Sequence, residues 1–189
     1  MPHHLTRRAF LVAAPVTLVA CSAEPVWAPD SAVQANRYVN PGVSELRLYT
    51  VRNSGSGNGA HSALLIDASE RVLFDPAGSF QANTVPERND LLHGFSPAVE
   101  RAYRSYHART EFLVIWQTIA VPPAVAEQAL QLARSHGAVA QANCARATSS
   151  ILRQLPGFES LGVTWFPDNL EEAFATLPGV TTEELREND

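Results

Sequence analysis

The chain has 189 residues and a formal net charge of −5 at pH 7, and all 14 of its basic residues are arginines. An acidic chain without lysine is a poor candidate for nucleic-acid binding, and it excludes Schiff-base lysines and lysine-dependent phosphate loops. The length allows one domain with a sizeable core, and the two cysteines, Cys21 and Cys144, are too few for a disulfide framework.

The N-terminus has the pattern of an export signal. Two arginines precede a short apolar stretch, residues 9–20, which is too short to predict a transmembrane helix. The Arg-Arg-x-Phe-Leu sequence resembles a twin-arginine signal, and residues 18–21 (Leu-Val-Ala-Cys) resemble a bacterial lipobox. We therefore expect residues 1–20 to be a signal peptide and Cys21 to be the lipidated first residue of an exported cell-envelope lipoprotein that faces the periplasm. The alternative is an ordinary secretory signal that happens to precede a cysteine.

The next segment, residues 21–43, is rich in Ala, Pro, Val and Ser and has no periodicity. This composition predicts a tether between the lipid and a domain formed by residues 44–189. In the alternative, the segment docks onto the domain through its aromatic residues Trp27 and Tyr38.

The first half of the domain has mainly the pattern of strands. Alternating or continuous apolar residues predict strands over residues 46–51, 60–66 and 71–75. A Gly/Asn/Ser loop separates the first two, and the three residues 68–70 are few enough for a hairpin turn between the second and third. Residues 76–95 have no regular pattern.

The second half has mainly the pattern of helices. Ser96 as N-cap and Pro97 at the first helical position predict a helix to about residue 106. A long apolar run then predicts a strand over residues 112–121. Three further helices are predicted: one from Pro122-Pro123 to about Ser135 with Gly137 as its stop, one from Asn143 to about Leu155, and one capped by Asp168 and Glu171. Strands followed by helices predict an α+β fold with an antiparallel sheet packed against helices.

Cys144 is the first candidate for chemistry. It follows Asn143, a good N-cap residue, so its thiol lies in the first turn of a helix. Unpaired amides and the helix dipole favour negative charge there, which lowers a thiol pKa and offers donors for an oxyanion. The alternative is a small buried hydrophobic residue.

A reactive thiol needs a base, and histidine has the suitable ordinary pKa. Of the six histidines, His61 is the best placed, because it lies on a predicted strand among small residues. A three-residue hairpin turn pairs Asp67 with Arg71 and puts Asp75 diagonal to His61 on the same face of the sheet. A two-residue turn would put Asp75 on the opposite face. In the alternative, His61 is a structural residue and Asp75-Pro is only a turn starter.

Three short motifs carry a resemblance to a known family, at residues 59–66 (GAHSALLI), 72–76 (VLFDP) and 143–145 (NCA). They resemble the circularly permuted branch of the papain-like NlpC superfamily, which includes lecithin-retinol-acyltransferase-like proteins. In the common NlpC order the cysteine helix precedes the histidine strand, whereas here His61 precedes Cys144. The resemblance covers about residues 45–155. It implies a permuted papain-like architecture with Cys144 as nucleophile, His61 as base and Asp75 as orienting residue, where the family more often has His, Asn or Gln.

These residues predict a thiol hydrolase or acyltransferase that acts on an amide or ester through an acyl-enzyme and needs no cofactor or metal. The envelope location favours cell-wall peptides as substrate, although no accessory wall-binding domain is apparent, and the permuted topology leaves lipid acyl groups open. The expected partners are the membrane, through the lipid anchor, and a peptide or acyl substrate. Two alternatives are a non-catalytic binding lipoprotein with the same fold and a metal site of His61, Cys144 and an acid, which no local ligand spacing supports.

Overall fold

The computed structural model describes residue 23 and residues 25–188, so the expected signal peptide and Cys21 lie outside the described residues. Within them the chain forms five helices: α1 (Asp30–Asn36), α2 (Pro97–His107), α3 (Pro123–His136), α4 (Cys144–Leu152) and α5 (Pro167–Ala175). It also forms seven strands: β1 (Glu45–Asn53), β2 (Gly59–Asp67), β3 (Arg71–Phe74), β4 (Glu87–Arg88), β5 (Leu91–Leu92), β6 (Phe112–Ala120) and β7 (Thr181–Arg186).

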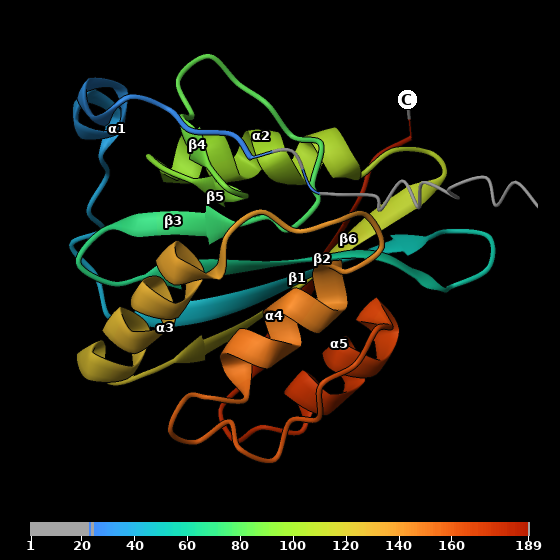
Figure 1. Cartoon of the computed structure of the whole chain (residues 1–189). Helices are drawn as coiled ribbons and strands as arrows, with labels where there is room; N and C mark the ends of the chain where they lie inside the picture. Colours follow the sequence, from blue (N-terminus) through green and yellow to red (C-terminus); the bar gives the residue numbers. More distant parts are fainter. Residues whose placement is uncertain (1–22, 24, 189) are drawn as a thin grey trace, which may run out of the picture.

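All seven strands join one antiparallel sheet in the order β4-β5-β3-β2-β1-β6-β7. Helices α3, α4 and α5 cover one face of the sheet, and α2 covers the other (Figure 1). The α+β class and the antiparallel sheet are therefore confirmed.

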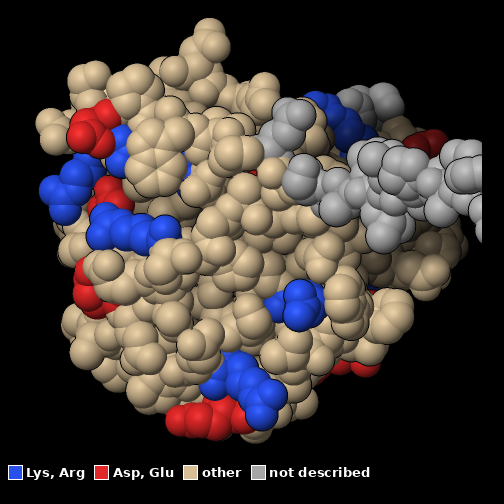
Figure 2. Space-filling view, in the orientation of Figure 1, with Lys and Arg blue, Asp and Glu red and all other residues tan. Residues whose placement is uncertain are grey.

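Each face of the sheet has its own core, because successive side chains of a strand point to opposite faces. Leu48 and Leu64 pack with Leu152 of α4 on one face, whereas Tyr49 and Leu65 lie in the cluster with Tyr103 of α2 on the other. None of the helices in the described ranges is long and apolar enough to cross a membrane. On the face seen in Figure 2, charged side chains lie mainly along the margin.

The hairpin of β2 and β3 has the register that the sequence predicts. Asp67 pairs with Arg71, so three residues form the turn, and the ladder continues to the pair Leu64–Phe74. One residue further, Asp75 lies on the same face as the odd-numbered residues of β2, including His61. The turn length alone therefore decides that these two side chains share a face.

The described part of the predicted tether lies on the domain. The Ala28 amide donates to the Glu87 carbonyl at 2.9 Å, and the Arg71 amide donates to the Tyr38 carbonyl at 2.8 Å. Helix α1 packs so closely that a Cβ on Gly94, whose φ is +71°, would lie 2.3 Å from the Asn36 carbonyl oxygen. Backbone pairing thus holds this segment even though its side-chain pattern shows no periodicity.

One predicted helix cap is confirmed only in its position, and another is wrong. Asn143 is the N-cap residue of α4, but its side chain donates to the Gln141 carbonyl at 3.0 Å and makes no capping hydrogen bond. Helix α5 starts at Pro167, whose fixed φ suits the first helical position, so Asp168 lies inside the first turn and is not the N-cap. Glu171 instead accepts a hydrogen bond from Arg52 of β1 at 2.8 Å. By contrast, Ser96 caps α2 as predicted, with its side chain accepting from the Val99 amide.

Three strands have no counterpart in the sequence-based assignment. Strands β4 and β5 have two residues each, which is too few for any periodic signal, and they lie in the stretch 76–95 that shows no regular pattern. Strand β7 has the sequence Thr-Thr-Glu-Glu-Leu-Arg and is mostly exposed, so its side chains do not show the apolar alternation of a half-buried strand. It forms because its backbone pairs with β6.

Candidate active site

His61 and Asp75 are in direct contact. His61 lies near the start of β2, and Asp75 directly follows β3. The His61 Nε2–H donates to Asp75 Oδ1 at 2.7 Å, so the prediction that both side chains share a face is confirmed. Because Asp75 takes Nε2, the opposite ring nitrogen, Nδ1, is the one left for a nucleophile.

Cys144 reaches the same imidazole from a different element. It is the first residue of α4, as predicted, and its side chain is hydrogen-bonded to that of His61. The β2–β3 ladder ends at the pair Leu64–Phe74, so the Ser62 amide lies beyond it and hydrogen-bonds the Cys144 sulfur, as does the Ala145 amide. The structure therefore brings together all three candidate residues that the sequence singles out within the domain.

The electrostatics favour a charged pair. Burial lowers the pKa of His61, but the charge and hydrogen bond of Asp75, together with Cys144, outweigh this effect and raise the pKa to about 10. Burial raises the pKa of the Cys144 thiol, but the hydrogen bond and charge of His61 and the amides of Ser62 and Ala145 bring it below its usual range. The charged form of each side chain stabilises the charged form of the other. The site therefore favours a thiolate on Cys144 beside an imidazolium on His61.

Asp75 is held from several sides. Burial raises the pKa of its carboxyl group, but His61 and the Tyr103 hydroxyl bring the pKa below its usual range. Tyr103 of α2 donates to Asp75 Oδ1 at 2.9 Å. A Cβ on Gly78 would lie 1.9 Å from Asp75 Oδ2, so only glycine fits there without moving the carboxylate. The carboxylate orientation that the imidazole needs is thus fixed by its surroundings.

His107, the last residue of α2, forms one wall of the site. Its ring stacks on that of His61 with centroids 5.8 Å apart and an interplanar angle of 22°. Burial, together with the positive charge of His61, outweighs the opposing effect of Asp75 and lowers the pKa of His107 to about 4. His107 is therefore neutral at pH 7 and does not compete with His61 for a proton.

An open cavity of about 700 Å³ adjoins this group. His61 and His107 line it, together with Tyr106, Phe112 and the turn around Gly78. The Cys144 side chain is not part of this lining and is only 7% exposed. A substrate in the cavity thus meets the imidazole first, and the sulfur lies behind it.

Tyr103 and His107 are site residues that the sequence analysis did not identify. A helical pattern could have indicated them, because Glu100, Tyr103 and His107 are spaced at i, i+3 and i+7 on one face of α2. This spacing shows that the three side chains point the same way, but it does not show which face of the sheet α2 covers.

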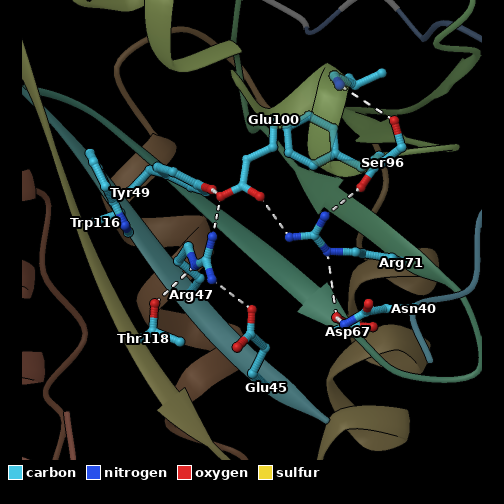
Figure 3. A network of polar contacts seen from close by, with 12 residues as sticks. Asn40, Glu45, Arg47, Tyr49, Asp67, Arg71, Ser96, Glu100, Trp116 and Thr118 are labelled. Carbon is cyan, nitrogen blue, oxygen red and sulfur yellow. Dashed lines mark hydrogen bonds and ion pairs between the residues drawn. The ribbon is translucent and has the colours of Figure 1, made fainter. Parts of the chain in front are cut away.

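A second group of polar residues lies under the other half of α2 (Figure 3). Both oxygens of the buried Glu100 carboxylate are occupied: Tyr49 donates to Oε1 at 2.5 Å, Arg47 contacts the same oxygen, and Arg71 donates to Oε2 at 2.7 Å. Arg71 also contacts Asp67 at 3.5 Å. In the described part of the chain, no group of three or more His, Cys, Asp and Glu residues is arranged to hold a metal ion.

No protein-family model, no curated protein and no solved structure matches this chain. The function is therefore argued from the chemistry of Cys144, His61 and Asp75 and from the order in which the chain brings them together.

Proposed function

We propose that this protein is a thiol hydrolase or acyltransferase in which Cys144 is the nucleophile, His61 the base and acid, and Asp75 the orienting carboxylate. The observation that carries the proposal is the position of His61 between the other two. Its Nε2–H donates to Asp75 at 2.7 Å while its ring is also hydrogen-bonded to Cys144. A nucleophile, a base within hydrogen-bond reach and a third group that orients the base are the parts that covalent acyl transfer needs.

The reaction proceeds in two steps. The Cys144 thiolate attacks the carbonyl carbon of an amide or ester, and the S–C bond forms as His61 gives its proton to the leaving amine or alcohol. In the second step His61 takes a proton from water or from an acceptor alcohol, whose oxygen attacks the thioester and releases Cys144. Within each step the former carbonyl oxygen carries negative charge in the tetrahedral intermediate, and the amides of the first turn of α4 that have no intrahelical partner are suited to stabilise it.

We further propose that the domain is a permuted papain-like domain of the NlpC type. The support is the chain order, with the histidine on β2, the carboxylate after β3 and the cysteine at the start of α4. Helix α4 contacts β2, which brings the cysteine helix against the histidine strand. The acidic residue at the orienting position differs from the His, Asn or Gln more common in that family.

The proposed location is the cell envelope, with the domain anchored through a lipid on Cys21. The support is the sequence of residues 7–21, with its paired arginines, short apolar stretch and lipobox-like end. Cys21→Ala should abolish acylation and release the protein from membranes. An unmodified Cys21, found by mass spectrometry in the mature protein from its own host, would remove the anchor from the proposal.

Thiol labelling at controlled pH tests the catalytic proposal. Cys144 in the folded protein should react with iodoacetamide near neutral pH, well below the ordinary thiol pKa of about 8.5. His61→Ala should abolish this reactivity at neutral pH and leave the alkaline reaction intact. Mass spectrometry after incubation with cell-wall peptides and with acyl esters then identifies the class that leaves an acyl group on Cys144.

A binding protein without catalysis is the second candidate. It is favoured by one observation, the low exposure of Cys144 behind the cavity. A Cys144 that stays unlabelled at every pH at which the protein is folded, with no acyl adduct from either substrate class, would favour binding over catalysis.

A further inference from the structure

The segment that follows Cys21 is bound to the domain from Val26 onward, only a few residues after the proposed lipid. The Asn89 amide donates to the Val26 carbonyl at 2.9 Å, and Arg88 Nε donates to the Ala28 carbonyl at 2.8 Å. Five residue steps separate Cys21 from Val26, and a fully extended chain spans at most about 3.6 Å per residue, or about 18 Å in all. If Cys21 carries a lipid, the part of the domain around Val26 cannot be further than this from the bilayer.

Two exposed tryptophans lie on that side of the domain, and each is stacked by an arginine. The Arg88 guanidinium lies 4.6 Å from the ring centroid of Trp27, and the Arg146 guanidinium lies 5.0 Å from that of Trp165. Trp27 is 66% exposed and Trp165 is 55% exposed, and Phe166 beside Trp165 is 61% exposed. These are unusually large apolar side chains for a surface that contacts only water.

The two tryptophan–arginine pairs share one face of the molecule. Trp27 and Arg88 line a small cavity together with Arg134, in the last turn of α3. Arg146 lines a neighbouring cavity together with His136, two residues further along the same turn. The last turn of α3 thus borders both cavities, and the two tryptophans beside them are exposed.

The charge on this face suits an anionic surface. In the view of Figure 2, acidic side chains lie along the margins and are missing from the centre that the grey atoms leave visible. Arg88 is ion-paired with the exposed Asp30, and its own side chain is only 18% exposed. Among the described residues Arg146 forms no ion pair with a carboxylate, so Arg146 is the cation that this face leaves for an anionic surface.

We infer that the face bearing Trp27 and Trp165, each with its stacked arginine, is a membrane-docking surface that lies flat on the headgroups of an anionic phospholipid bilayer. Tryptophan is favoured at the headgroup level because it has an apolar ring and a polar N–H, and arginine pairs with lipid phosphates. The inference rests on the proposed lipidation, which brings Trp27 within reach of the bilayer. The lipid holds the domain near the membrane, and this face decides which side of the domain is turned to it.

The natural tryptophans allow a direct test, because the chain has three and the third, Trp116, is buried. The acylated mature protein is reconstituted into vesicles of phosphatidylglycerol and phosphatidylcholine, with or without bromine near the headgroup end of the acyl chains. Bromine quenches tryptophans at the interface, so wild-type emission should fall about twofold. Trp27→Phe/Trp165→Phe should lose this quenching, whereas the matched variant Trp116→Phe should keep it.

Equal emission from wild-type protein in the two kinds of vesicle would overturn the inference, and so would quenching that persists in the double variant. The mass of the N-terminal peptide from the same sample reports acylation separately. An acylated protein without quenching refutes the docking surface and leaves the anchor intact. If the peptide is unacylated, the proposed anchor is refuted. Quenching by the same vesicles would then support a docking surface that binds without the lipid, and its absence would refute that surface as well.

Discussion

Helix α2 contacts two buried carboxylate groups on one face of the sheet, its own Glu100 and Asp75, which follows β3. The two carboxylates differ in the residues to which they are connected. Glu100 is a member of the network in Figure 3, in which Tyr49, Arg47 and Arg71 occupy both carboxylate oxygens. One turn further along α2, Tyr103 holds Asp75, whose other partner is His61.

The two groups differ in whether their contacts reach a cavity. The Glu100 network ends in its own partners, and neither Glu100 nor its two arginines line any of the three cavities described. The chain of contacts from Asp75 continues through His61 to a thiol and to an open cavity of about 700 Å³. Buried charge by itself is therefore weak evidence for a functional site, and buried charge that ends on a thiol beside a cavity makes the better candidate.

The largest effect is expected at Cys144. Cys144→Ala should abolish covalent turnover and thiol labelling, because the sulfur forms the bond to the acyl group. His61→Ala should do nearly the same, and the double variant should be no worse than either single variant, since residues that act as a unit are non-additive. The melting temperature should change little in Cys144→Ala, because a functional site is rarely optimised for stability. It should fall in the two variants that lack His61, because they leave the buried Asp75 carboxylate without its histidine partner. Turnover, labelling and thermal denaturation check this prediction.

The comparison would break if Cys144→Ala lowered the melting temperature strongly and left the activity per folded molecule intact. Cys144 and His61 would then belong with Glu100 as structural residues.

The positions of His61, Asp75 and Cys144 could be predicted from the sequence. The three-residue turn at 68–70 fixes which residues of β2 and β3 share a face, and it thereby identifies Asp75 as the partner of His61. This information is local, because turn length sets register. Cys144 was likewise placed at a helix start, because Asn143 is the N-cap residue of α4, although its side chain makes no capping hydrogen bond.

Contacts across the sheet could not be placed. The pattern of α2 shows an amphipathic helix, but neither its position over β1 and β3 nor the contact of Tyr103 with Asp75 follows from local sequence. The pairing of β7 was missed for the same reason, and the docking of residues 26–40 was expected only as the alternative to a free tether. Each depends on backbone hydrogen bonds to a distant strand, which side-chain periodicity does not record.

The second effect concerns stability and is expected at Glu100. Glu100→Ala leaves Arg47 and Arg71 buried without their main partner, which should cost about 3–5 kcal/mol of unfolding free energy. The activity per folded molecule should be retained, because the network does not reach the cavity. Urea denaturation and active-site titration measure the two quantities, and the exposed Arg101→Ala in the same helix is the matched control. A Glu100→Ala protein that is stable but inactive would contradict this prediction, because the Glu100 network would then take part in the activity.

A smaller effect is expected from Asp75→Asn, which keeps the shape of the side chain and removes its charge. The pKa of His61 should fall from about 10 toward its ordinary 6.5, because the Asp75 carboxylate is the main group that raises it. The thiol then loses its cationic partner at neutral pH, and its pKa rises. Labelling at pH 7 should slow about tenfold, a pKa shift of about one unit, and recover at alkaline pH. A pH profile identical to that of the wild type would show that Asp75 does not tune the pair.

The smallest effect tests a buried carboxylate with no link to either group. The His93 ring, whose Nδ1 lies 3.4 Å from the Glu70 carboxylate, and the hydrogen bond from Arg134 lower the pKa of Glu70 from 4.5 to about 2 against the effect of burial. Because the folded-state pKa is the lower one, Glu70 stabilises the fold above pH 4.5, and this contribution is lost as the pH falls toward 2. The half-exposed Arg37 and Arg134 weaken the effect, so Glu70→Gln should cost about 1 kcal/mol at pH 7 and almost nothing near pH 2. Denaturation at both pH values checks this, and an equal loss at both would assign the effect to packing.

Strand β7 has a consequence for how the protein behaves at high concentration. Without it, the apolar strand β6 would present a row of unpaired backbone groups to other chains, which is a template for aggregation. With it, the outermost strand on that side carries the neighbouring carboxylates of Glu183 and Glu184, and two such strands repel one another when they approach. The polar strand that escapes detection by hydropathy thus covers an apolar edge that would otherwise be open to pairing with other chains.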